Sequence, residues 1–226
     1  MAREAHRASD HWRLLTGLEA ASKKYSAETH ETPAFWNFTL NAHYDATLFR
    51  LARLYDQHDC SLGLKRFLLT VKASVEYFSD GARRKRLNHN PFVEGLLSRK
   101  LNPATLGGDI WRVSQDGDPL VGRLCNLRNQ FLSHVEPNPV RLGKPSTTRL
   151  ENKEIQILLK RACKILNRYS LTYRASLLSA KVVCADDYNH VLDLLRRGRG
   201  AVITAHDDGI RRFKDQLHGK LGCRIP

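Results

Sequence analysis

The chain has 226 residues, of which 42% are hydrophobic and 27% charged, a composition typical of a globular protein and unlike that of collagen-like or mucin-like chains. Lysine and arginine together number 37 against 23 acidic residues, and the resulting net charge of +14 favours a polyanionic partner such as nucleic acid, the alternative being solubility alone. Because no apolar run is long enough to span a bilayer and the first residues are charged where a signal peptide is apolar, we expect a cytoplasmic protein without membrane association.

The first third of the chain shows helical spacing of its apolar residues. It predicts one helix over residues 10–28 and a second that begins at Thr32-Pro33, with an apolar stripe from Leu40 to about Gln57. A third helix, which Ser61 can cap, is expected to reach Phe78 and to stop near Asp80-Gly81. These three segments predict helices joined by short links.

The middle of the chain, residues 83–117, has mixed polarity and several helix-breaking residues. Pro91, Pro103, Gly107 and Gly108 all lie in it. The segment is therefore predicted to be a long irregular connection with one short helix near residues 91–97.

The second half of the chain again predicts helices. Asp118-Pro119 is typical of a cap and first turn, so a helix is expected from there to about Ser133, before Pro137 and Pro139. A long helix is predicted over residues 153–178, a shorter one from Asp186 or Asp187 to Arg197, and a last one around Ile210, Phe213 and Leu217, whereas residues 201–204 give a weak indication of a strand.

These elements predict an all-α fold, an up-down antiparallel helical bundle with a C-terminal helical extension. We expect a bundle domain over residues 1–180 and a basic helical extension over residues 181–226. The five cysteines are scattered, with no Cys-x-x-Cys pair: Cys60, Cys125, Cys163, Cys184 and Cys223. They predict reduced, partly buried thiols rather than a disulfide framework or a zinc site, and we expect neither a metal nor another cofactor.

The predicted helix that starts at Pro119 carries an arginine in an unusual place. Its apolar stripe contains Leu124 and Phe131, and Arg128 borders that stripe on a helical wheel. Because a guanidinium does not deprotonate, a largely desolvated one needs a carboxylate or a phosphate as a partner. Asp45 and Asp56 could pair with Arg128, or both could lie on a solvated helix face.

Arg128 also opens a short motif that ends at a histidine: Arg128-Asn129-Gln130-Phe131-Leu132-Ser133-His134. An arginine six residues before a histidine is uninformative alone, because Arg83 with His89 and Arg212 with His218 have the same spacing. The asparagine directly after the arginine distinguishes this pair. The motif resembles the Arg-Asn-x-x-x-x-His motif of the HEPN superfamily, and residues 41–58 resemble its abortive-infection branch.

The resemblance implies a HEPN-like bundle and a metal-independent endoribonuclease of a prokaryotic defence or toxin-antitoxin system. It assigns catalysis to Arg128, Asn129 and His134: the histidine would transfer protons, the arginine would bind the phosphate, and Asn129 would orient Arg128 or a phosphate. With one motif histidine per chain, it also implies a homodimer that brings two motifs together. The residues after His134 depart from toxins that are silenced by nucleotidylation of a nearby tyrosine, because Val135-Glu136-Pro137 stands there.

Several alternatives stay open. The block Arg83, Arg84, Lys85 and Arg86 is a candidate RNA-binding loop, or otherwise a solvated charge run. The doublets His58-Asp59 and His206-Asp207, with His43, weakly resemble helical metal-dependent phosphohydrolases. The basic C-terminal stretch could dock a cognate antitoxin or another defence-system protein. The alternative to a nuclease is a non-catalytic HEPN-like module that binds RNA or a protein.

Overall fold

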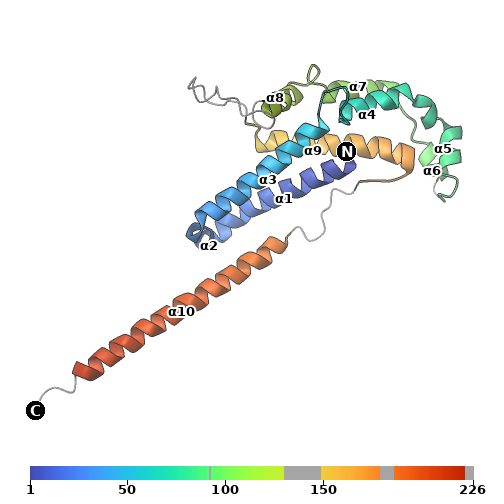
Figure 1. Cartoon of the computed structure of the whole chain (residues 1–226). Helices are drawn as coiled ribbons and strands as arrows, with labels where there is room; N and C mark the ends of the chain where they lie inside the picture. Colours follow the sequence, from blue (N-terminus) through green and yellow to red (C-terminus); the bar gives the residue numbers. More distant parts are fainter. Residues whose placement is uncertain (92, 130–148, 179–185, 222–226) are drawn as a thin grey trace, which may run out of the picture. The chain divides into compact units, whose positions relative to one another are not determined.

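The computed structural model describes residues 1–91, 93–129, 149–178 and 186–221. In these four ranges the chain forms ten α-helices and one 3-10 helix and no strand, so the prediction of an all-α helical bundle is confirmed there (Figure 1). The helices are α1 (Ala2–Lys24), α2 (Ser26–Glu31), α3 (Pro33–Leu54), α4 (Leu64–Ala73), η1 (Val75–Phe78), α5 (Asp80–Arg86), α6 (Val93–Leu97), α7 (Pro103–Val113), α8 (Pro119–Leu127), α9 (Asn152–Arg174) and α10 (Asp187–Leu221). Among these helices, none combines the length and the apolar character needed to cross a membrane.

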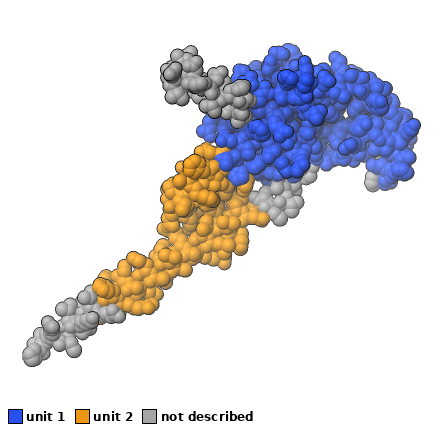
Figure 2. Space-filling model, in the orientation of Figure 1, with its two compact units in different colours: residues 1–13, 42–182 blue, residues 14–41, 183–226 orange. Residues whose placement is uncertain are grey.

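Contacts divide the chain into two compact units. One unit contains the described parts of residues 1–13 and 42–182, and the other contains those of residues 14–41 and 183–226; Figure 2 shows them in blue and orange. The second unit thus joins the C-terminal helix to residues 14–41. This grouping differs from the predicted division of the chain at residue 180. The domain boundary at that position stays a prediction.

The first unit is built on α9, whose apolar residues recur every three or four positions. Seven of them are buried: Ile155, Leu158, Leu159, Ala162, Ile165, Leu166 and Tyr169. The helix begins where the Glu154 side chain accepts the backbone N–H of Glu151 at 2.9 Å. Two tyrosines of the α3 region donate their hydroxyls to backbone carbonyls on this side of the core, Tyr55 to Leu158 at 2.8 Å and Tyr44 to Leu150 at 3.2 Å. The predicted long helix is confirmed, although it ends at Arg174.

The prediction of an irregular connection over residues 83–117 is wrong for most of its length, because this stretch contains most of α5 and all of α7. The short helix expected near residues 91–97 is confirmed as α6. Asn102 caps α7 by accepting the N–H groups of Ala104 and Thr105, and Pro103 occupies the first turn. Gly107 and Gly108 lie inside this helix. A glycine costs a helix only about 1 kcal/mol relative to alanine, and α7 offsets this by packing against α4.

The third predicted helix is shorter than expected. It begins at Leu64 with Gly63 as its N-terminal cap, so Ser61 precedes it, and it breaks at Ser74 before the 3-10 turn η1.

The C-terminal prediction of two short helices and a strand-like stretch is also wrong, because α10 runs without interruption from Asp187 to Leu221. Its first half is fixed within the second unit: Leu192 is buried with Ala21 and Tyr25, and the Tyr25 hydroxyl donates to Asp193 at 2.6 Å. Once these turns have formed, each further residue adds a hydrogen bond at little cost. The helix therefore continues through Gly198 and Gly200.

Candidate active site

The predicted start of α8 is confirmed in detail. The Asp118 side chain accepts the backbone N–H groups of Leu120 at 2.8 Å and Val121 at 3.4 Å, and Pro119 occupies the first turn. One face of the helix is buried through Val121, Leu124, Cys125 and Leu127. Residues 128–129 continue it with a π-helical turn, a local change that is frequent at functional sites. The helix thus presents Arg128 and Asn129 at its end.

Arg128 is held between two side chains. Its Nη1 donates to Asp56 Oδ1, while its Nε and Nη2 donate to Asn129 Oδ1 at 3.1 and 3.0 Å. The guanidinium side chain is 27% exposed, and it has more N–H donors than these contacts with described residues use. A phosphate oxygen could accept the remaining donors. The contact with Asn129 agrees with the orienting role expected of that residue, whose part in catalysis stays a prediction.

Asp56 is the carboxylate that pairs with Arg128, whereas Asp45 is exposed on α3. Asp56 lies two residues after the end of α3, and its side chain contacts Arg128 at the end of α8. Its partial burial alone would raise the carboxyl pKa, but hydrogen bonds from the His58 backbone N–H and from Arg128, together with the positive charge of Arg128, hold that pKa below its usual value. Asp56 therefore stays ionised and keeps the guanidinium in one orientation.

The loop from Tyr55 to Gly63 carries Asp56 of this ion pair. Gln57 Nε2 donates to the carbonyls of Tyr55 at 2.6 Å and Val113 at 3.0 Å. A side chain at Gly63 would place its Cβ 2.5 Å from the Asp56 carbonyl oxygen, so only glycine fits the return of the loop. These contacts tie the loop to itself and to the end of α7.

His58 lies in the same loop, although the sequence pattern groups it with Asp59 and His43 as part of a possible metal site. The described part of the chain contains no cluster of three His, Cys, Asp or Glu side chains that could hold a metal ion. The ring is exposed, and its backbone N–H donates to Asp56 Oδ1 at 3.1 Å. The sequence signal that could have pointed to His58 is its position two residues after Asp56, a candidate partner of Arg128.

Beside the ion pair lies Cys125, a buried thiol whose Sγ is 3.9 Å from the Tyr55 carbonyl oxygen. Burial raises the pKa of this thiol above its usual value, so the thiol stays protonated. It contributes an apolar wall to the site and no charge.

His134 lies outside the described residues, as does the rest of the motif from Gln130 onward. Its assignment as a proton-transfer group stays a prediction.

The predicted RNA-binding block forms the end of α5 and not a loop, so its side chains point in different directions. Arg83 is completely buried, with its guanidinium directed at the carbonyls of Leu96 and Leu97. Arg84 pairs with Glu94, and Lys85 is exposed.

Arg86, the last residue of the block, donates to the Tyr173 carbonyl at 2.8 Å and lies 3.8 Å over the ring of Tyr173. Two side chains of the block, Arg84 and Lys85, are thus exposed. RNA binding by the block stays a prediction.

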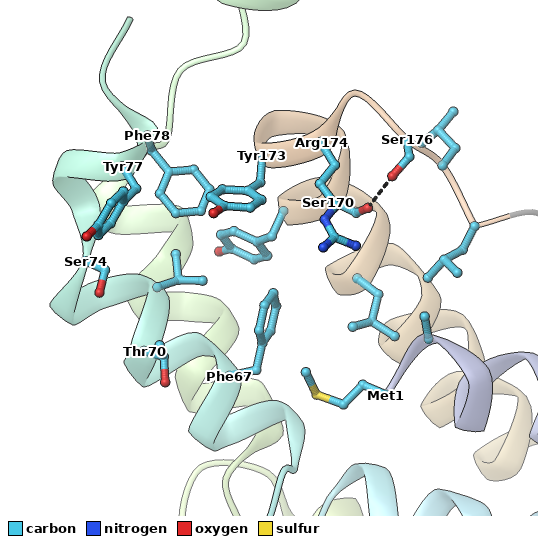
Figure 3. Close-up of a pocket in the computed structure, with 16 residues that line it drawn as sticks. Met1, Phe67, Thr70, Ser74, Tyr77, Phe78, Ser170, Tyr173, Arg174 and Ser176 are labelled. Atoms are coloured by element: carbon cyan, nitrogen blue, oxygen red, sulfur yellow. Dashed lines mark hydrogen bonds between the residues drawn. The ribbon is translucent and has the colours of Figure 1, made fainter. Parts of the chain in front are cut away.

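A separate cavity of about 670 Å³ opens in the first unit, between α4, η1 and α9 (Figure 3). Aromatic rings form much of its wall, including Phe67, Phe78 and Tyr173, and the hydroxyls of Ser170 and Ser176 lie 2.9 Å apart at its edge. Among the described residues, none of those that line it belongs to the predicted catalytic motif or to the basic block, so the cavity and the Arg128 side chain are distinct features.

Comparison with known protein families matches residues 1–197 with AbiU2, a family of HEPN proteins. No curated protein and no solved structure matches the chain. The matched range includes Asp56, Arg128, Asn129 and the unplaced His134, and it stops within the first third of α10. It covers most of the chain, and it agrees with the all-helical fold and with the motif at the end of α8. The chain therefore belongs to the AbiU2 family of HEPN proteins, which is related to abortive infection.

Proposed function

We propose that the protein is a metal-independent endoribonuclease of a prokaryotic abortive-infection or toxin-antitoxin system, acting as a homodimer on RNA. The observation that carries the proposal is the state of Arg128: a partly exposed guanidinium, fixed by Asp56 and Asn129, with donors to spare at the start of the family motif. Such a group is ready to bind a phosphodiester without reorganising.

The reaction is an attack of the RNA 2′-oxygen on the adjacent phosphorus. A neutral imidazole takes the 2′-hydroxyl proton as the O2′–P bond forms, and an imidazolium gives a proton to the 5′-oxygen as the P–O5′ bond breaks. The products are a 2′,3′-cyclic phosphate and a 5′-hydroxyl. Arg128 balances the negative charge that grows on the phosphorane, and Asn129 and Asp56 keep its guanidinium in place.

The homodimer supplies the second imidazole. One motif histidine per chain serves as base or acid but not as both in the same step, and a two-fold axis through the site brings the His134 of two copies to one phosphodiester. The net charge of +14 favours the approach of RNA to this site. A cognate antitoxin or another defence-system protein would act by separating or covering the two motifs.

Cleavage in the presence of a chelator tests the proposal directly. End-labelled tRNA and mRNA are incubated with purified wild type, with His134→Ala and, as a matched control, with Arg123→Gln, which removes an exposed arginine of the same helix α8. We expect cleavage by the wild type and the control, cyclic phosphate ends, and no cleavage by His134→Ala. Full activity of His134→Ala, or activity that the chelator abolishes, contradicts the mechanism.

The alternative is a non-catalytic HEPN module that binds RNA or protein, and one observation favours it. The part of α10 that lies beyond the family match has exposed apolar side chains, among them Val202 and Phe213. A protein partner could cover such a surface. RNA binding without cleavage by the wild type under every condition favours this module over the nuclease.

A further inference from the structure

The loop after α3 carries the imidazole of His58 two residues after Asp56, the carboxylate that pairs with Arg128. Asp56 Oδ1 accepts the backbone N–H of His58 at 3.1 Å, and the same oxygen atom accepts Nη1 of Arg128. One carboxylate oxygen therefore joins the His58 backbone to the guanidinium. A phosphate bound by the Arg128 donors that no described residue uses would therefore occupy a site to which this loop contributes Asp56.

The His58 ring is held in a defined tautomer. Its Nδ1 accepts the backbone N–H of Cys60 at 3.2 Å, and a backbone N–H group can only donate. The neutral ring therefore carries its proton on Nε2, the atom at the far side from this contact. Because the ring is exposed, the Nε2–H group is open to a ligand.

The loop that carries His58 is built to hold its shape. Ser61 donates both its backbone N–H, at 3.0 Å, and its hydroxyl, at 2.9 Å, to the His58 carbonyl. Gln57 Oε1 also accepts the backbone N–H of Gln115 at 3.3 Å, which fixes the loop to the segment after α7. The backbone on both sides of His58 is thus anchored, and little conformational freedom is lost when a ligand binds.

We propose that His58 is a substrate-binding residue of this site, which donates its Nε2–H to a non-bridging oxygen of the RNA phosphate held by Arg128. The inference rests on the proposed nuclease function and deepens it. The Nε2 proton stays on the ring throughout, so His58 adds a hydrogen-bond donor where charge develops and takes no part in proton transfer. The acid and the base remain the two copies of His134.

The first test separates a donor from a proton-transfer group. His58→Ala removes the donor, His58→Gln keeps an N–H donor at the position of Nε2, and His58→Asn places its amide at the position of Nδ1. We expect kcat/KM for RNA to fall about 30-fold in His58→Ala and His58→Asn, a size usual for one hydrogen bond to a charged group. It should recover to within about 3-fold of wild type in His58→Gln. The shape of the pH–rate profile should be the same in all four proteins.

Three results of this test overturn the inference. His58→Ala with wild-type kcat/KM shows that the ring does not touch the substrate. His58→Gln as slow as His58→Ala, with one limb of the pH profile lost, shows that His58 transfers a proton. Loss of activity in His190→Ala, which removes an exposed histidine of α10, shows that the assay responds to histidine loss in general.

A second test does not need catalysis, so it distinguishes failure of the inference from failure of the proposed function. A fluorescent RNA with 2′-deoxy nucleotides cannot be cleaved, and its Kd is measured by anisotropy for wild type, His58→Ala and His58→Gln, with thermal unfolding to confirm folding. If His58→Ala binds this RNA more weakly than wild type and His58→Gln does not, the result supports phosphate binding by His58 even if the wild type cleaves nothing. Equal binding by all three, together with an imidazole ¹⁵N spectrum that places the His58 proton on Nδ1, overturns it.

Discussion

Arg83 in α5 and Arg128 at the end of α8 each belong to a sequence feature that predicts RNA contact, yet their surroundings in the structure differ. The side chain of Arg83 is completely buried and donates to backbone carbonyls, whereas that of Arg128 is 27% exposed and is held by the side chains of Asp56 and Asn129. Arg83 therefore joins α5 to the end of α6. Arg128 is left available to a ligand.

The difference shows why a run of positive charge is a poor guide to a binding surface. Successive residues of a helix point about 100° apart, so four adjacent basic residues cannot share one face. Arg83 faces the protein and Lys85 faces solvent, only two residues away. A motif of side chains that hold one another, such as Arg128 with Asn129, gives more information because its geometry restricts what it can do.

The largest expected effect is on catalysis at Arg128. Arg128→Ala should lower kcat/KM for RNA cleavage about 10³-fold, because the charge that grows on the phosphorane loses its positively charged donor. Arg128→Lys should recover only part of this loss, since an ammonium cannot reproduce the planar set of donors. Steady-state cleavage rates measure the effect, and circular dichroism should show unchanged helix content. Wild-type rates in Arg128→Ala would place Arg128 among the structural arginines with Arg83.

Arg83 should show the opposite pattern. Arg83→Met keeps an apolar side chain of similar length but leaves the carbonyls of Leu96 and Leu97 without their donor, so we expect the free energy of unfolding to fall by about 3 kcal/mol. Urea unfolding followed by circular dichroism measures the loss, with Lys85→Gln as the exposed control. Cleavage per folded molecule should stay at the wild-type level. A stable Arg83→Met protein with weak RNA binding would reverse the assignment.

Local features of the sequence predict local structure well. The cap and proline at Asp118-Pro119 and the apolar spacing of α9 depend on neighbours in the chain, and both predictions are confirmed. The prediction for residues 83–117 fails because it treats Gly107, Gly108 and Pro103 as helix breakers, while the packing of α7 on α4 decides the outcome. In the same way, α10 continues through its glycines because Leu192 in its first half is fixed by contacts with Ala21 and Tyr25.

The candidate site could be predicted only in part. Arg128 and Asn129 are adjacent, so their contact follows from the motif, but Asp56 lies 72 residues from Arg128. The sequence leaves two carboxylates as possible partners, because it predicts a helix to about Gln57 that carries both Asp45 and Asp56. The helix ends at Leu54 instead, which releases Asp56 and His58 into a loop that approaches α8. A shift of about one turn in one helix end thus changes which side chains form the site.

Asp56→Asn tests whether that loop positions Arg128. The amide keeps the shape but loses the charge, so we expect cleavage to slow about 10-fold with Arg128 still present. The pKa of Asp56 is lower in the folded protein than its ordinary value, so its stabilising contribution is complete above that value and is lost as pH falls through the folded pKa. The stability difference between wild type and Asp56→Asn, measured by urea unfolding, should be constant near neutral pH and vanish in acid. A stability difference that grows as the pH falls contradicts a lowered pKa of Asp56 in the folded protein.

The smallest expected effect concerns the two exposed residues of the basic block. If Arg84 and Lys85 bind RNA phosphates, the double variant Arg84→Gln/Lys85→Gln should bind RNA only a few-fold more weakly at physiological salt. Removing one phosphate interaction with a single strand lowers the slope of log K against log salt concentration by about 0.7, so removing both should lower it by at most about 1.4. Because Arg84 is paired with Glu94, it should contribute less than Lys85 to the change in slope. Lys85→Gln alone should therefore account for most of that change. An unchanged slope would leave the entire α5 block with the structural role that Arg83 already has, and would confine RNA binding to residues elsewhere in the chain.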